Sequence, residues 1–199
     1  MARGKRQNVI VVTGTPGTGK TTLAKRLARA TDAKYLSITQ YVADRKLYRA
    51  LDRQRRTKIV DQAKTRRSLK RALADMRAPV VVDSHLSEGM VPAQMVRLAI
   101  VLRCHPRILE ARLRAKKWAS RKIRENVLAE ILDSCLTAAV GYYGARKVMQ
   151  IDTSHKNLRH CVDLARNALS GKRSGSGVKV DWLARLEKER VLDRYLRYL

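Results

Sequence analysis

The chain of 199 residues contains no phenylalanine, and phenylalanine, tryptophan and tyrosine together make up only 5% of it. Because 45% of the residues are nevertheless hydrophobic, the core has to be built from Leu, Val, Ile and Ala. Only three cysteines are present, Cys104, Cys135 and Cys161, and none has C-x-x-C spacing. We expect them to be buried apolar residues, which argues against a disulfide framework or a cysteine-based zinc site.

Long hydrophobic runs are also missing. No stretch approaches the ~18 apolar residues of a transmembrane helix, and residues 1–6 do not have a signal-peptide pattern. We therefore expect no membrane partner and a cytoplasmic location. The length suits one domain of ordinary size with a small appendage.

Negative charge is scarce: 17 acidic residues face 44 Lys and Arg, which gives a formal net charge of +27. Self-repulsion on this scale favours a polyanionic partner, and nucleic acid is the leading candidate. Residues 45–71 hold twelve basic residues against two Asp, and residues 112–124 hold seven against none. Aromatic residues are sparse there, so we expect contacts with the nucleic-acid backbone rather than base stacking. A solvated helix face or thermophile-style charge enrichment is the alternative.

One octet, Gly14–Thr21, reads GTPGTGKT and satisfies the pattern G-x-x-x-x-G-K-[ST]. It follows an apolar run and precedes a helical stretch, which is the context of a phosphate-binding P-loop. Its glycines allow a tight turn that directs backbone N–H groups at phosphates, and the following helix adds its positive N-terminal end. We expect this loop to bind a nucleoside triphosphate, with Lys20 on the β/γ-phosphates and the Thr21 hydroxyl on Mg²⁺. The alternative is a glycine-rich turn that binds nothing.

A second phosphate motif is formed by the apolar run 80–82, which ends in Asp83. A carboxylate at the end of a strand near a P-loop is the position that holds Mg²⁺, directly or through water. His85 follows two residues later, on the same side of an extended chain as Asp83. Both residues are common in structural roles too, but their place at the predicted nucleotide edge favours function.

Short β-branched runs alternate with longer helical stretches along the chain, which predicts an α/β fold with a five-stranded parallel sheet between helical layers. The predicted strands are residues 9–13, 34–36, 79–83, 99–102 and 148–151. The predicted helices are residues 20–30, 39–48, 58–76, 106–114 and 120–140. Residues 171–177, rich in Gly and Ser, predict a linker. Beyond it, Asp181 is expected to cap a C-terminal helix within residues 178–199.

Four motifs together, GTPGTGKTTLA, VVVDSH, LRCHPRILEARLRAKKW and KIREN, resemble the archaeal and eukaryotic adenylate kinase-like family over residues Val9 to about Lys156. Members of that family are nucleoside monophosphate kinases with ATPase activity that assist late maturation of the small ribosomal subunit. The resemblance implies ATP and Mg²⁺ as cofactors and AMP or another nucleoside monophosphate as acceptor. It also implies a small-subunit ribosomal protein and rRNA as partners.

The resemblance implies a P-loop kinase-like domain over residues 1–170, with a monophosphate-binding segment at about 37–60 and a lid at about 115–125. It assigns the Asp83–His85 pair to magnesium and a water molecule, and Lys156 to the nucleotide base. We expect the lid cations Arg112 and Lys116 to surround the migrating phosphoryl group. The ATP-contacting residues implied by the match are Gly17, Gly19, Lys20, Thr21, Thr22, Lys116 and Lys156.

Two departures from the family pattern bear on the activity. Lys116 stands where the family has a lid arginine, and lysine lacks the planar fork that binds phosphate bidentately. The monophosphate-binding segment is basic, and Gln40 stands where an Asp is usual. These departures favour an alternative, a nucleotide-switched factor that binds RNA or a ribosomal protein and has negligible kinase turnover. A kinase for an RNA end or another small metabolite is a third possibility.

Overall fold

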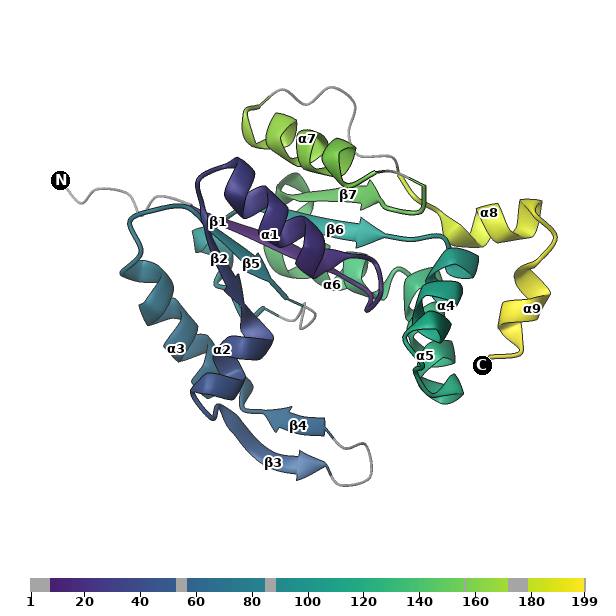
Figure 1. The fold of residues 1–199 in the computed structure, drawn as a ribbon, viewed down its shortest axis with the longest axis horizontal. Helices are drawn as coiled ribbons and strands as arrows, with labels where there is room; N and C mark the ends of the chain where they lie inside the picture. Colours follow the sequence, from purple (N-terminus) through teal and green to yellow (C-terminus); the bar gives the residue numbers. More distant parts are fainter. Residues whose placement is uncertain (1–7, 53–56, 85–88, 156, 172–178, 199) are drawn as a thin grey trace.

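The computed structural model describes residues 8–52, 57–84, 89–155, 157–171 and 179–198. Its centre is a five-stranded sheet with the strand order β2-β5-β1-β6-β7, in which every pairing is parallel (Figure 1). The prediction of an α/β fold with a five-stranded parallel sheet is therefore confirmed. The strands are β1 (Val9–Gly14), β2 (Lys34–Ser37), β5 (Val80–Asp83), β6 (Val96–Arg103) and β7 (Val148–Asp152).

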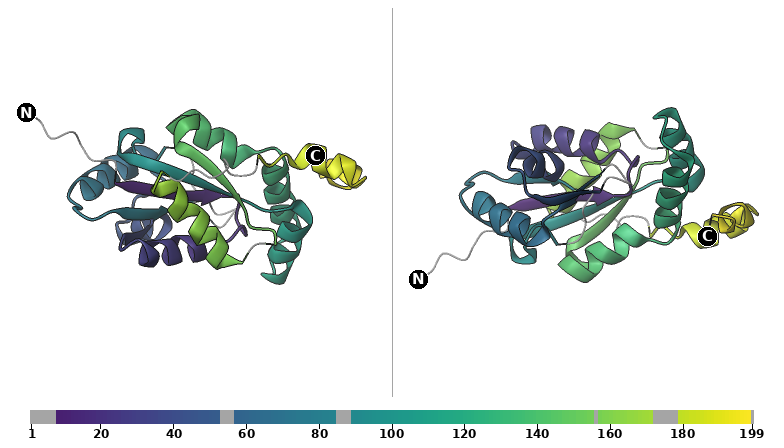
Figure 2. Two further views of the ribbon diagram at one scale, coloured as in Figure 1. Left: turned by 90° about the horizontal axis from the view of Figure 1, so that it is seen from above. Right: turned by 90° about the horizontal axis from the view of Figure 1, so that it is seen from below.

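Helices cover both faces of this sheet, which explains why its central strands read as continuous apolar runs. Alternate residues of β1 serve the two faces: Ile10 and Val12 pack with α1 and α7, whereas Val9 and Val11 pack with α2, α3 and α6. Figure 2 shows the resulting three layers. The covering helices are α1 (Lys20–Ala30), α2 (Ile38–Asp44), α3 (Gln62–Ala74), α6 (Ser134–Tyr143) and α7 (Leu158–Leu169).

A separate helical group lies beyond the carboxyl ends of the central strands (Figure 1). It has its own apolar cluster, to which Leu109, Val127, Leu186 and Tyr195 contribute buried side chains. Leu186 and Tyr195 come from the C-terminal segment, which therefore packs against the two helices that follow β6. The group consists of α4 (Pro106–Ala115), α5 (Ser120–Ile131), α8 (Trp182–Lys188) and α9 (Leu192–Leu196).

Residues 48–60 form an antiparallel hairpin of β3 (Tyr48–Asp52) and β4 (Thr57–Val60). The predicted helices over 39–48 and 58–76 are therefore wrong at these ends. The first helix ends at Asp44, and Lys46 takes a positive φ of 51° in the turn that follows. The second begins only at Gln62, because the carboxylate of Asp61 accepts a hydrogen bond from the backbone N–H of Lys64 and caps it.

The single helix predicted over 120–140 is also wrong, since α5 ends at Ile131 and α6 begins at Ser134. Asp133 lies between them with a positive φ of 55°, and its carboxylate pairs with Arg103. The C-terminal segment is likewise divided into α8 and α9 by Arg190, whose φ is 55°. As predicted, Asp181 caps α8, since its carboxylate accepts from the backbone N–H of Ala184.

The remaining described elements are two short 3₁₀ helices, η1 (Ala93–Met95) and η2 (Ala145–Lys147). None of the helices in the described ranges has the length and apolar character needed to cross a membrane. Cys104 and Cys161 are buried, as predicted, whereas Cys135 is half-buried.

Candidate nucleotide-binding site

The P-loop joins the end of β1 to the start of α1 and depends on glycines with positive φ. Gly14 has a φ of 136°, and a Cβ there would lie 2.4 Å from the backbone oxygen of Leu102 in β6. Gly19, with a φ of 97°, is the N-cap of α1 and supplies no side-chain hydrogen bond to it. The first backbone N–H groups of α1 therefore lack a side-chain acceptor, and the helix dipole adds positive potential at the same place. This combination suits an anion such as a phosphate.

Lys20 is almost fully buried and folds back over its own loop. Its Nζ donates hydrogen bonds to the backbone oxygens of Gly14 (2.7 Å) and Thr15 (3.1 Å). Burial lowers the pKa of Lys20 below its ordinary value of 10.5, while the negative charges of Asp83 and Glu130 act in the opposite direction. A phosphate would offer this ammonium group stronger, charged acceptors than the two carbonyls.

Asp83 ends β5 directly beside the P-loop. Its carboxylate accepts a hydrogen bond of 2.6 Å from the Thr21 hydroxyl and one of 3.1 Å from the Tyr35 phenol. The parallel register produces this meeting, because Asp83 is paired with Val12 of β1 on one side and with Ser37 of β2 on the other. Thr21 and Asp83 thus lie together, as an Mg²⁺ site requires.

Tyr35 also contacts the candidate site, although it belongs to neither sequence motif. Burial, followed by the charge of Asp83, raises the pKa of its phenol to about 12, so the group stays protonated and donates to the carboxylate. The available signal was its position: a tyrosine within the predicted strand 34–36, one residue before its carboxyl end, as Asp83 is at the carboxyl end of its own predicted strand.

Glu130 of α5 lies under the P-loop and is 2% exposed. Its carboxylate accepts hydrogen bonds from the Thr15 hydroxyl (2.6 Å), Arg103 Nε (2.9 Å), Trp182 Nε1 (2.9 Å) and the backbone N–H of Cys104 (3.1 Å). Sequence reasoning missed this residue as well. The sequence feature that points to it is its position in the helix. Glu130 shares the buried face of α5 with Ile123 and Val127, and a carboxylate on such a face needs a hydrogen-bond partner.

Arg112 of α4 is linked to the P-loop through one residue. Its guanidinium donates to the backbone oxygen of Thr153 (2.8 Å), and the Thr153 hydroxyl donates to the backbone oxygen of Thr18 in the loop (2.9 Å). Lys116, at the end of the same helix, is exposed and is close enough for its charge to lower the pKa of Lys20. Both predicted lid cations therefore lie on the P-loop side of the molecule.

The outer side of the loop is open to a ligand. Gly19, Thr21 and Thr22 are exposed, whereas Gly17 is half-buried. His85 and Lys156, predicted to orient water and to contact the base, lie outside the described residues. Within the described ranges no group of three or more His, Cys, Asp or Glu side chains could hold a metal ion. Thr21 and Asp83 nevertheless fit Mg²⁺, which commonly takes only one or two protein oxygens and completes its shell with water and phosphate.

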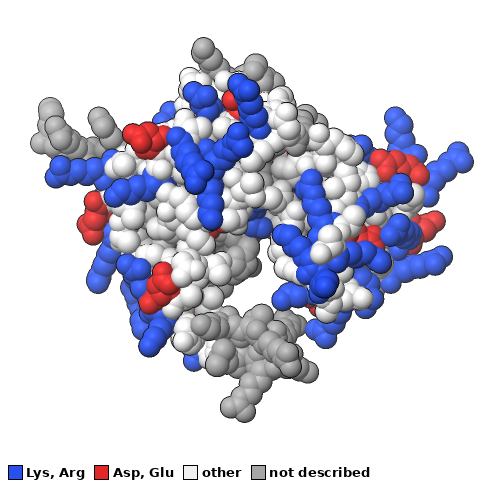
Figure 3. Space-filling model, in the orientation of Figure 1, with Lys and Arg blue, Asp and Glu red and all other residues white. Residues whose placement is uncertain are grey.

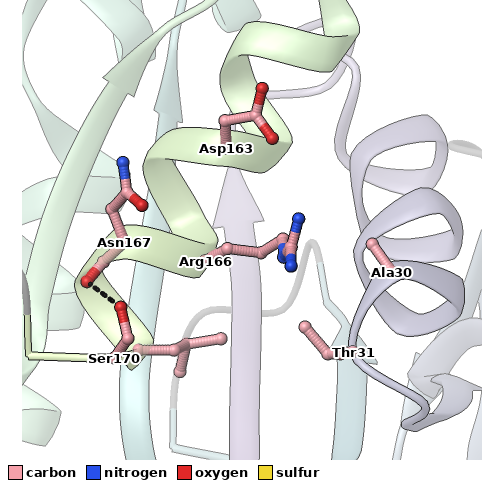
Figure 4. Close-up of a pocket in the computed structure, with 7 residues that line it drawn as sticks. Ala30, Thr31, Asp163, Arg166, Asn167 and Ser170 are labelled. Carbon is pink, nitrogen blue, oxygen red and sulfur yellow. Dashed lines mark hydrogen bonds between the residues drawn. The ribbon is translucent and has the colours of Figure 1, made fainter.

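A solvent-open hollow of about 530 Å³ lies at the other end of α1. Arg166 extends from α7 toward Ala30 and Thr31 there, with Asp163 and Asn167 on the same helix (Figure 4). None of the predicted site residues lines this hollow. Within the described ranges, the candidate phosphate-binding residues therefore lie at the P-loop end of α1, away from this hollow.

Comparison with known proteins gives three kinds of likeness. A family model described as an AAA domain matches residues 10–133. A relative named "Putative adenylate kinase" from Methanocaldococcus jannaschii is 35% identical over 173 residues, which cover 87% of this chain and 92% of the relative. A relative of the same name from Pyrococcus abyssi is 34% identical over 192 residues, with 96% and 97% covered.

Among solved structures, the shikimate kinase from Acinetobacter baumannii in complex with shikimate aligns with a TM-score of 0.60 at 12% identity. The alignment covers 86% of this chain and 97% of the kinase. The shikimate kinase from Bacteroides thetaiotaomicron aligns with a TM-score of 0.55 at 18% identity, and covers 81% and 98%. At these identities the likeness concerns the fold, which is that of a P-loop kinase.

Proposed function

Since the chain belongs to the AAA-domain family and is related to proteins named "Putative adenylate kinase", we propose that it is a nucleoside monophosphate kinase with ATPase activity. It transfers the γ-phosphate of ATP to AMP or another nucleoside monophosphate. The observation that carries the proposal is the contact between the Thr21 hydroxyl and the Asp83 carboxylate beside Lys20. A turn that binds nothing has no reason to bring these three groups together.

In this proposal Thr21 and Asp83 hold Mg²⁺. When bound, the ion neutralises charge on the phosphates. Lys20 exchanges its two backbone carbonyls for the β/γ-phosphates, while Gly17, Gly19 and Thr22 line the outer side of the loop. Tyr35 keeps the Asp83 carboxylate in place by donating its phenolic proton.

Phosphoryl transfer to a monophosphate needs no general base, because the acceptor phosphate is already ionised. Catalysis is then positioning and charge neutralisation. Arg112 and Lys116 supply positive charge from the lid side, and closure of residues 115–125 excludes water. The roles of His85 in orienting water and of Lys156 at the base stay predictions.

The kinase proposal is tested by measuring ADP formation from ATP plus AMP beside phosphate release from ATP alone. Wild-type protein is expected to form ADP in proportion to AMP, and Lys20→Met is expected to abolish both reactions. Lys70→Met is the matched control, because it makes the same substitution at an exposed position on α3. Absence of AMP-dependent ADP formation by the wild type would remove the kinase proposal.

We further propose that the chain acts in late maturation of the small ribosomal subunit, in contact with rRNA and a small-subunit ribosomal protein. The charge distribution supports an RNA partner: Lys and Arg are spread over the face in Figure 3 and outnumber Asp and Glu there. Helix α3 alone carries five exposed basic residues, and its helical span has no acidic one. These residues are Lys64, Arg66, Arg67, Lys70 and Arg71.

RNA binding through these residues is tested by its salt dependence. The logarithm of the binding constant should fall against the logarithm of salt concentration by about 0.7 per phosphate contact for single strands. The triple variant Arg67→Ser, Lys70→Ser, Arg71→Ser should weaken binding and reduce the slope by about 2. Neutralising three exposed arginines of the opposite helical layer, Arg26, Arg29 and Arg159, should have a smaller effect. An affinity that does not change with salt would contradict the proposal.

The second candidate is a nucleotide-switched assembly factor with negligible kinase turnover. Lys116 favours this candidate, because the family that the sequence resembles has a lid arginine at this position. The exposed lysine lacks the planar fork with which arginine binds a phosphate bidentately. Under this candidate the wild type binds ATP and RNA but forms no AMP-dependent ADP, so the kinase assay separates the two. Restoration of transfer by Lys116→Arg would identify the lysine as the cause.

A further inference from the structure

Thr15 organises the P-loop from within. Its backbone oxygen accepts hydrogen bonds from Lys20 Nζ (3.1 Å), from the Thr18 hydroxyl (2.8 Å) and from the Thr18 backbone N–H (3.3 Å). Its hydroxyl points the other way and donates to Glu130 Oε2 at 2.6 Å. The orientation of Thr15, and with it the carbonyl that holds Lys20, is therefore fixed by the Glu130 carboxylate.

The Glu130 carboxylate is held by donors from other parts of the chain. Its second oxygen, Oε1, accepts from Arg103 Nε and the Cys104 backbone N–H at the end of β6, and from the indole N–H of Trp182 in α8. Arg103 is itself 1% exposed and is bound also to Asp133 and Gln150. The position and energy of a buried carboxylate depend on every donor that it has, because solvent does not replace a hydrogen bond that is lost in the interior.

Trp182 belongs to the C-terminal segment, far along the chain from the P-loop, and is 1% exposed. The segment is held in place by other contacts: Leu186 and Tyr195 are buried in the cluster with α4 and α5, and Glu189 pairs with His105 at 3.0 Å. The Trp182 N–H bond is therefore not needed to attach α8. What it adds is one of the four donors on Glu130.

We propose that the C-terminal helix α8 sets the conformation of the nucleotide loop through the chain of hydrogen bonds Trp182–Glu130–Thr15. Glu130 and Trp182 are positioning residues for ATP: they touch no phosphate and act by orienting Thr15 and Lys20. The inference rests on the proposed function, since it takes ATP as the ligand of the loop. It also gives the C-terminal segment a role at the site.

The test uses the full chain and measures the dissociation constant of Mg²⁺-ATP by titration calorimetry. Trp182→Phe removes the indole N–H but keeps an aromatic ring. It is expected to weaken ATP binding by up to about tenfold, which corresponds to the transfer to the loop of the free energy of one hydrogen bond to a charged group. Tyr195→Phe is the matched control, because the buried Tyr195 hydroxyl in the same segment has no hydrogen-bond partner within the described residues. It should leave the dissociation constant within about twofold of the wild-type value.

A double-mutant cycle separates positioning from a general loss of stability. If α8 acts through Thr15, Trp182→Phe should have no further effect on ATP affinity in a Thr15→Val background, whereas independent effects would multiply. Thr15→Ser, which keeps the hydroxyl, should restore near wild-type affinity. Thr15→Val does not change α8, so its ATP affinity tests the inference even if Trp182→Phe fails to fold. An unchanged ATP affinity in Thr15→Val overturns the inference.

The two proposals fail differently. A wild-type chain that does not bind Mg²⁺-ATP would overturn the proposed function, and the inference with it. If the wild-type chain binds ATP, two results would overturn only the link from α8 to the loop. The first is a Trp182→Phe variant with wild-type ATP affinity, and the second is a double-mutant cycle in which the effects of Trp182→Phe and Thr15→Val on ATP affinity multiply.

Discussion

The hydroxyl of Thr21 donates a 2.6 Å hydrogen bond to the carboxylate of Asp83, although 62 positions separate the two residues in the chain. The strand order explains the contact: β5 pairs directly with β1, so the carboxylate at the end of β5 reaches the first turn of α1. The phosphate loop and the strand-end acid therefore form one site. It is this pairing that makes a magnesium-dependent reaction the leading proposal.

Asp83→Asn should abolish the magnesium dependence of ATP binding. The amide oxygen can still accept from Thr21 and Tyr35, so the fold should survive, but the negative charge that attracts the cation is lost. We expect ATP turnover to fall by about 10²- to 10³-fold, the cost of removing one fixed electrostatic group from a catalytic site. Titration of ADP formation against Mg²⁺ concentration measures the effect. A wild-type response to Mg²⁺ in the variant would rule out Asp83 as a metal ligand.

Tyr35→Phe tests the donor that sequence reasoning missed. With its pKa raised to about 12, the phenol stays protonated at any ordinary assay pH and donates to Asp83 throughout. Its loss should reduce ATP turnover by about 3- to 10-fold. The wild-type minus variant difference in phenolate absorbance should titrate near pH 12, well above the ordinary value of 10.0. A difference spectrum that titrates near 10 would contradict the burial of the phenol and its contact with Asp83.

The sheet could be predicted because its central strands β1, β5 and β6 are buried on both faces and therefore read as apolar runs between helices. The P-loop and Asp83 could be found for a related reason, since parallel strands carry their functional groups at one edge. The hairpin of β3 and β4 could not: it lies in a basic segment whose sequence shows no regular alternation of apolar and polar residues. The break at Asp133 was missed because its left-handed conformation is coupled to Arg103, a contact set by the tertiary fold.

The residues that support the candidate site were harder to predict than the residues of its two sequence motifs. Lys20, Thr21 and Asp83 belong to motifs in which residue type and spacing are fixed by phosphate chemistry. Glu130 and Trp182 belong to none, because their roles come from packing between α5 and α8, which only the folded chain brings together. A carboxylate in the apolar register of a helix was the one local sign of such a role.

Two glycines of the P-loop should respond differently to a methyl group. Gly14→Ala places a Cβ 2.4 Å from the backbone oxygen of Leu102, which cannot move without disturbing β6. We expect a loss of about 2–5 kcal/mol in the free energy of unfolding, from strain and overpacking together. Gly19→Ala meets nothing within 4 Å and carries only the strain of its positive φ, about 1–2 kcal/mol. Denaturant unfolding measures both, and equal losses would contradict the close approach at Gly14.

Stability in acid should depend on His105, which is buried between α4 and the C-terminal segment. Its Nδ1 accepts from the backbone N–H of Arg107, so in the neutral ring Nε2 carries the proton and donates to Glu189. Burial lowers the pKa of His105 below its ordinary value of 6.5, an effect that the charge of Glu189 opposes, while Arg185 and Arg107 reinforce it. The folded state therefore binds a proton at this ring less readily than the unfolded state does.

This difference has a definite sign. Because the folded pKa lies below the unfolded one, the contribution of His105 is fully present above pH 6.5 and is lost as the pH falls through the folded value. Unfolding of the wild type below pH 6.5 should take up as much as about one proton more than unfolding of His105→Asn, whose side chain can still cap α4. The measurement is the free energy of unfolding at closely spaced pH values between about 7 and 5. If the stability of the wild type falls no faster with pH than that of the variant, the pKa of His105 lies at or above its ordinary value. The charge of Glu189 would then raise this pKa by at least as much as burial lowers it.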